Sequence, residues 1–94
     1  MRVEYSKRAL ADLRQIAAYY ARSGDSAIAD RIAERIQQVI ARIAVSPLSG
    51  RTVVGRPGVR AALLPRYRYK IFYRVAEDAI RIVHIRHTSR RPYD

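Results

Sequence analysis

The sequence contains no cysteine and no tryptophan, and it has four glycines and four prolines among 94 residues. Without cysteine the chain can form no disulfide, no thiolate metal site and no cysteine nucleophile. No apolar run approaches the roughly 20 residues of a membrane-spanning helix, and the first residues hold no signal-peptide core. We therefore expect a cytoplasmic protein that does not interact with a membrane.

Acidic residues are also scarce. The chain has 19 lysine and arginine residues against 8 aspartate and glutamate residues, which gives a net charge of +11 at pH 7. The excess is greatest in the C-terminal half, and it predicts long-range attraction to phosphate or carboxylate surfaces. A chain of this length suits one domain with a modest core, so we expect residues 1–94 to form a single domain.

Two amphipathic helices are expected in the first half of the chain. Apolar residues recur at three- and four-residue steps over residues 7–22, and Ser6 stands where a helix N-cap is favoured. After a break at residues 23–26, a second apolar stripe continues to the Ser46-Pro47 pair, which ends the helix. The short link between the two helices predicts an antiparallel hairpin.

The rest of the chain reads as strands. Residues 3–5 alternate like a short first strand, and residues 47–58 form a loop that is rich in proline and glycine. Beyond this loop, short apolar runs predict three strands, over residues 59–64, 68–75 and 79–87. The expected fold class is therefore α+β, with a short N-terminal strand, an antiparallel helical hairpin and a three-stranded antiparallel C-terminal sheet.

The turn at residues 76–79 allows a register to be argued for the last two strands. With a two- or four-residue loop, Val75 faces Ile80. By the same count Ile71 faces His84, on an apolar face that should meet the helices. A three-residue loop would instead turn the last strand over. In the first register the opposite face gathers a basic patch, which consists of Arg68, Lys70, Arg74, Arg81 and His87.

No metal or cofactor site is predicted. His84 and His87 would project to opposite faces of a strand, and His84 is interpreted as a packing residue. No nucleophile, base and acid occur in a recognisable pattern, and no glycine-rich phosphate loop precedes a helix. The tyrosines at 67, 69 and 73 alternate with cations like a base-stacking platform, but this spacing is more typical of a core face. A basic strand face can bind phosphates, and it could also stabilise phosphodiester cleavage.

Several motifs together resemble the RelE/ParE superfamily of toxins from bacterial type II toxin–antitoxin systems. The resemblance extends over essentially the whole chain. Its most specific parts are an S-x-x-A-x-x-D-L opening, a P-x-x-G-R turn, a Y-x-I-x-Y-R-V strand and a closing H-x-x-R. These motifs comprise Ser6, Ala9, Asp12 and Leu13; Pro47, Gly50 and Arg51; Tyr69, Ile71, Tyr73, Arg74 and Val75; and His87 and Arg90.

The resemblance implies the same β-α-α-β-β-β order, and a toxin held inactive by a small cognate antitoxin in a hetero-oligomer. An acidic, partly disordered antitoxin segment would fold onto the basic surface and gain affinity through charge pairing. The basic patch would thus be shared by the target and the antitoxin.

The superfamily divides by target. RelE-like members cleave mRNA in the ribosomal A site, whereas ParE-like members poison DNA gyrase without being hydrolases. If the chain were RelE-like, the resemblance would assign cleavage to Arg60, Lys70, His87, Arg90 and Tyr93.

Two departures favour the ParE-like branch. Residues 61–64 are apolar where RelE-like chains carry further lysine, and the hairpin around residues 19–29 is long. We therefore expect a gyrase inhibitor rather than an enzyme. The alternatives are a ribosome-dependent mRNA endonuclease and, third, a basic nucleic-acid-binding module without toxicity.

Overall fold

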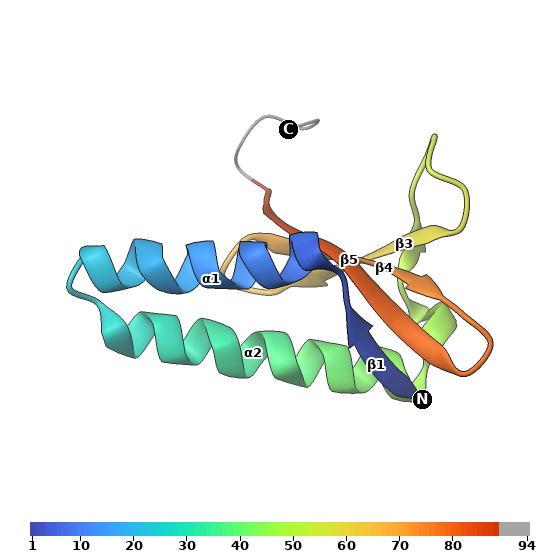
Figure 1. The fold of residues 1–94 in the computed structure, drawn as a ribbon, viewed down its shortest axis with the longest axis horizontal. Helices are drawn as coiled ribbons and strands as arrows, with labels where there is room; N and C mark the ends of the chain where they lie inside the picture. The colour runs from blue at the N-terminus through green and yellow to red at the C-terminus, as the bar shows by residue number, and fades with distance from the viewer. Residues whose placement is uncertain (89–94) are drawn as a thin grey trace.

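The computed structural model describes residues 1–88. A helical hairpin lies beside a sheet, and the end of the hairpin where the two helices join extends away from the strands (Figure 1). The elements in chain order are β1 (Arg2–Tyr5), α1 (Lys7–Arg22), α2 (Ser26–Val45), the 3-10 helix η1 (Pro47–Ser49), β2 (Arg51–Thr52), β3 (Val59–Leu64), β4 (Tyr69–Val75) and β5 (Ala79–His87).

The predicted α+β class and the helical hairpin are confirmed. Ser6 caps α1 through its Oγ, which accepts a hydrogen bond of 2.9 Å from the backbone N of Ala9. The second helix buries its isoleucine and valine stripe against the sheet. Its buried members are Ile32, Ile36, Val39, Ile40 and Ile43.

The sheet differs from the prediction in its size and in its strand directions. It has five strands in the order β1-β5-β4-β3-β2, and β1 runs parallel to β5 while the other pairs are antiparallel. The expected three-stranded antiparallel sheet is thus the centre of a larger mixed one. Strand β2 was missed because two residues, Arg51 and Thr52, are too few to show an alternating pattern.

The two sides of the sheet have different roles. On the helix side, β4 contributes Tyr69, Ile71 and Tyr73 to the core, and Tyr73 is fully buried. The interpretation of these tyrosines as core residues is confirmed. The opposite side of the sheet, called here the outer face, carries the alternate residues of β4, which are Lys70, Phe72 and Arg74.

The predicted register of the β4–β5 hairpin is right near the turn and wrong beyond it. Val75 pairs with Ile80 as expected, but a bulge follows between Phe72 and Tyr73. The two strands then continue with the pairing shifted by one residue. As a result Ile71 pairs with Ile85, and not with His84.

Candidate functional site

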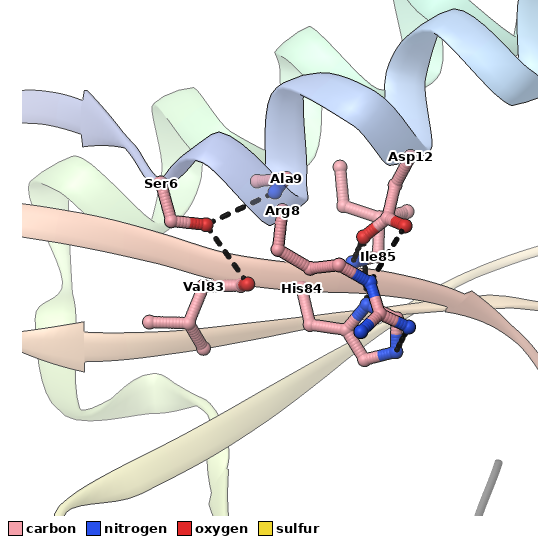
Figure 2. A network of polar contacts seen from close by, with 7 residues as sticks. All are labelled: Ser6, Arg8, Ala9, Asp12, Val83, His84 and Ile85. Atoms are coloured by element: carbon pink, nitrogen blue, oxygen red, sulfur yellow. Dashed lines mark hydrogen bonds and ion pairs between the residues drawn. The ribbon is translucent and has the colours of Figure 1, made fainter.

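A polar network joins the start of α1 to β5 at the bulge (Figure 2). Its centre is Asp12, which is the one buried charged side chain among residues 1–88 and is 7% exposed. Asp12 Oδ1 accepts a hydrogen bond of 3.2 Å from Arg8 Nε. Its Oδ2 accepts one of 2.9 Å from the backbone N of Ile85 and another of 2.6 Å from His84 Nδ1. A carboxylate cannot donate, so the shared hydrogen belongs to Nδ1 of His84.

Ser6 completes the network on the other side of the bulge. Its hydroxyl donates to the carbonyl of Val83 at 2.9 Å while it caps α1, and its backbone N donates to Ile82 O at 2.9 Å. Strand β1 ends at Tyr5, so Ser6 and Asp12 continue the hydrogen bonding of the β5 edge where no strand follows. The edge is thereby covered by a helix, which removes an open site for strand addition.

The bulge determines which β5 side chains reach the outer face. Beyond it, His84 pairs with Phe72 and Arg86 pairs with Lys70. The His84 ring stacks on Phe72 with 5.8 Å between ring centroids and 19° between planes. The Arg86 guanidinium also lies over the Phe72 ring, with its Cζ 5.8 Å from the ring centroid. An aromatic centre flanked by cations results.

A groove of about 1120 Å³ runs from α2 past the β2 and β3 edge onto this outer face. Its apolar lining includes Ala61, Leu63 and Phe72, and Leu63 is 60% exposed. The surrounding side chains are basic. They are Arg42, Arg51, Arg56, Lys70 and Arg86. A surface of this kind suits an extended or helical partner that has both apolar and acidic side chains.

Three members of the predicted basic patch lie on the outer face. Lys70 is exposed and pairs with Arg86 across the strands. Arg74 pairs with Arg81, and its Nη1 donates to Pro57 O at 3.1 Å.

Arg81 lies 3.7 Å from a carboxylate oxygen of Glu4 on β1, and the same carboxylate forms an ion pair with Arg2. The hydrogen bond to Glu4, with the nearby charge of Asp78, raises the pKa of Arg2.

The other two members are placed differently from the prediction. Arg68 lies in the turn before β4 with a φ of 58°, and its carbonyl accepts a hydrogen bond from Thr88 N. His87 pairs with Tyr69 and contacts its ring edge to face at 5.0 Å between centroids. The expected pair of Arg68 and His87 on the outer face is therefore wrong, because the bulge moves His87 to the helix side.

Within residues 1–88, the members of the set that a RelE-like reading would require are not brought together. Arg60 lies on β3, and its Nη1 donates to Leu48 O at 3.2 Å and to Gly50 O at 2.8 Å, so it holds the turn before β2. Lys70 is on the outer face, whereas His87 is on the helix side. Arg90 and Tyr93 lie outside the described residues.

A second buried polar anchor supports the same turn. The Tyr73 hydroxyl donates to Pro47 O at 2.8 Å and accepts from Gly50 N at 2.9 Å. A Cβ at Gly50 would collide with this hydroxyl, which explains why the P-x-x-G motif has glycine there.

Sequence reasoning identified Ser6 as the cap of α1 but missed its bond to Val83 O, the role of Asp12 and the place of Arg86 on the outer face. The S-x-x-A-x-x-D-L motif contained the signal for Asp12, but its partners are 72 and 73 residues away in the chain. His84 is a packing residue as interpreted, but it packs on Phe72 and not opposite Ile71, and in addition it pairs with Asp12.

Among residues 1–88 there is no group of three or more histidine, aspartate or glutamate side chains that could hold a metal ion. Within the same residues neither α1 nor α2 has the length and apolar character needed to cross a membrane.

Comparison with protein families gives a match over residues 3–92 to the model described as the ParE toxin of the type II toxin–antitoxin system parDE. No curated protein sequence matches the chain significantly. Among solved structures, the chain is similar to one from the chromosomal ParDE toxin–antitoxin system of P. aeruginosa. That similarity has a TM-score of 0.80 and 24% identity, and it covers 94% of this chain and 96% of the other.

Two further solved structures share the fold. One is from the intact E. coli RelBE toxin–antitoxin complex, with a TM-score of 0.69, 16% identity, and coverage of 95% of this chain and 98% of the other. The second is the isolated E. coli RelE toxin, with a TM-score of 0.68, 16% identity, and coverage of 96% and 86%.

Proposed function

The chain belongs to the ParE toxin family of type II toxin–antitoxin systems, and on this premise we propose that it acts in the cytoplasm by inhibiting DNA gyrase. It is the toxin of such a pair, and a small cognate antitoxin is its partner. Membership in the family does not by itself decide the target, because the RelE and ParE folds are alike.

One observation carries the choice of a non-enzymatic target over mRNA cleavage. Arg60, Lys70 and His87, the described members of the nuclease set, do not converge on a common point. Arg60 and His87 pair with Tyr73 and Tyr69, which are about 13 Å apart along an extended strand. Phosphodiester cleavage needs the phosphate-binding cation and the proton-transferring group within hydrogen-bond reach of one substrate.

The outer face supports the antitoxin part of the proposal. Of the predicted contact residues, Lys70, Arg74 and Arg81 remain on this face, and Arg86 joins them. Arg68 flanks them from the turn, while His87 lies on the helix side and would contact a partner only at the end of β5. An acidic segment that folds into the apolar groove would gain both apolar burial and charge pairing.

The target is tested with purified toxin in a gyrase supercoiling assay. We expect dose-dependent inhibition that is reversed by the cognate antitoxin. Normal supercoiling at a large excess of toxin would overturn the gyrase proposal. The same preparation is added to ribosomes programmed with mRNA, where cleavage at the A-site codon would instead establish the endonuclease.

The binding surface is tested by charge reversal. Lys70→Glu combined with Arg74→Glu should weaken antitoxin binding by more than about tenfold, because favourable pairs become repulsive. The matched control is Arg14→Glu combined with Arg31→Glu, which makes the same charge change on exposed positions of the helices. Equal weakening by both variants would show that net charge, and not the outer face, drives binding.

A further inference from the structure

The turn between β3 and β4 contains two arginines in an unfavourable backbone conformation. Arg66 has a φ of 81° and Arg68 a φ of 58°, and within residues 1–88 no other residue except glycine has a positive φ. Side chains with a Cβ rarely adopt this conformation, and turns that require it usually have glycine or asparagine there. Glycine at either position would therefore relieve strain in the turn.

The surrounding structure keeps the turn in this strained conformation. Tyr67, between the two arginines, packs against the core. The carbonyl of Arg68 accepts a hydrogen bond of 2.6 Å from Thr88 N, just beyond the end of β5. Arg66 and Arg68 themselves are exposed. Backbone strain that the rest of the fold maintains is concentrated at functional sites, and here it presents two cations to solvent.

Positive charge gathers at this end of the sheet without compensation. In the described part of the chain, neither Arg66 nor Arg68 forms an ion pair. Lys70 follows two positions later and pairs with Arg86 across the strands. Residues 35–76 contain no aspartate and no glutamate. A partner with closely spaced negative charges is therefore attracted to the turn.

The composition of the turn favours a nucleic acid over a protein as this partner. The lining of the large apolar groove does not include Pro65, Arg66 or Arg68. Protein interfaces have few charged residues at their centre, whereas interfaces with nucleic acids are polar and strongly positive. A guanidinium group also matches the geometry of a phosphate, to which it can donate two parallel hydrogen bonds.

The nearby aromatic residues favour a duplex over a single strand. Proteins bind single strands largely through bases that stack on aromatic side chains. Tyr67 packs against the core, and Tyr69 is only 6% exposed, so neither presents a free ring face to a base. A duplex needs no such surface, because it can be bound through the charges of its phosphate backbone alone.

We propose that the β3–β4 turn binds the phosphate backbone of duplex DNA, with Arg66 and Arg68 as the principal contacts. Each arginine lowers the stability of the turn and supplies a charge to the contact. The contact is electrostatic and does not depend on base sequence. It goes beyond gyrase inhibition and uses a turn outside the large groove, so the two proposals can fail separately.

The first test measures the affinity for a short fluorescent DNA duplex by anisotropy at several salt concentrations. Arg66→Gln combined with Arg68→Gln should make the slope of log affinity against log salt less steep by about 2, because each phosphate contact contributes about 0.9. Arg14→Gln combined with Arg22→Gln removes the same charge from exposed positions of α1 and should leave the slope unchanged. An equal change in both variants would show that net charge alone drives binding, and would overturn the proposal.

The second test uses the strain itself. Arg66→Gly and Arg68→Gly should each lower the equilibrium constant for unfolding about threefold in urea titrations, because relief of the left-handed strain exceeds the entropic cost of glycine. The same variants should bind duplex DNA more weakly. Arg56→Gly, at an exposed position where φ is not positive, is the control and should raise the unfolding constant. Variants at 66 and 68 that are no more stable than the wild type, or that bind DNA as tightly, would overturn the proposal.

The third test distinguishes the partners. The Arg66→Gln and Arg68→Gln double variant is titrated with the cognate antitoxin and with single-stranded RNA as well as with the duplex. A loss of affinity for the duplex with unchanged antitoxin binding would support the proposal. An equal loss of antitoxin affinity would place the turn in the protein interface instead. A loss for RNA but not for the duplex would assign the phosphates to a single strand, and either of these last two results would overturn the proposal.

Discussion

The two halves of the β4–β5 hairpin differ in what fixes their register. In the half near the turn, Val75 pairs with Ile80 and Tyr73 with Ile82, as the turn length alone predicts. In the far half the pairing is shifted by one residue at a bulge, so that Tyr69 meets His87. The length of the turn therefore predicts the register only as far as the bulge, where Ser6 and Asp12 bind β5.

Each half has its own buried polar anchor. In the near half the Tyr73 hydroxyl binds the turn before β2, with partners 23 and 26 residues away in sequence. In the far half Asp12 and Ser6 bind β5, with partners 72 to 77 residues away. The second anchor redirects the side chains that form the candidate site, so its loss should affect both stability and function.

The largest effect is expected from Asp12→Ala, which removes the anchor of the far half. The backbone N–H of Ile85 and the Nδ1–H of His84 would lose their acceptor, and each buried unsatisfied donor costs roughly 1–3 kcal/mol. We expect the free energy of unfolding to fall by about 3 kcal/mol in urea titrations. Asp30→Ala, at an exposed position of α2, is the control and should change it by less than about 0.5 kcal/mol.

A smaller loss is expected when the near half is strained. Gly50→Ala would place a Cβ against the Tyr73 hydroxyl, and overpacking of this kind typically costs about 1–3 kcal/mol. Ser49→Ala, at the exposed neighbouring position, should leave stability unchanged. Combined with Asp12→Ala, the Gly50→Ala loss should add to within about 0.5 kcal/mol if the two anchors are independent. A strongly non-additive result would show that the hairpin is one unit.

Tyr73→Phe tests the near anchor without adding volume. It removes the bond to Pro47 O and leaves the Gly50 N–H without its acceptor, so we expect a loss of about 1.5 kcal/mol. Tyr19→Phe, with a side chain that is half exposed, is the matched control. An equal effect of the two changes in urea unfolding would refute the anchoring role of the Tyr73 hydroxyl.

Most of the fold could be predicted from the sequence because its signals are local. The stripe of α2, the Ser6 cap and the alternation of β4 each lie within a few residues of one another, and the structure has all three. The side of β4 that faces the core was also predictable, since Tyr69 and Tyr73 are four positions apart and residues an even number of positions apart point to the same face of a strand.

The candidate site could be predicted only in part, because contacts distant in sequence determine it. Nothing near Val83 in the sequence indicates a bulge, since the residues that hold it are Ser6, the N-cap of α1, and Asp12 on α1. The bulge places Arg86 on the outer face and His87 on the helix side. The two-residue strand β2 likewise exists only because β3 pairs with it.

Ser6→Ala should weaken the far half by less than the Asp12 substitution does. The hydroxyl both caps α1 and donates to Val83 O, and loss of an N-cap side chain costs about 1 kcal/mol. Ser26→Ala, at the exposed first turn of α2, is a serine change of the same kind and should have little effect. A loss in Ser6→Ala no greater than that of the control, measured by urea unfolding, would show that the bulge does not depend on this hydroxyl.

The smallest effect is expected at Tyr5, the last residue of β1 before helix α1 takes over the β5 edge. Partial burial raises the pKa of the Tyr5 hydroxyl, so the folded state favours the neutral phenol. The neutral phenol is present in both states below about pH 10, and stability falls as the pH rises above this value because the unfolded chain ionises first. Near neutral pH, the free energy of unfolding of Tyr5→Phe should therefore depend on pH as that of the wild type does. Under alkaline conditions it should fall less than that of the wild type. Parallel curves of unfolding free energy against pH would show that Tyr5 titrates alike in both states, and that the junction of strand and helix at this edge is open to water.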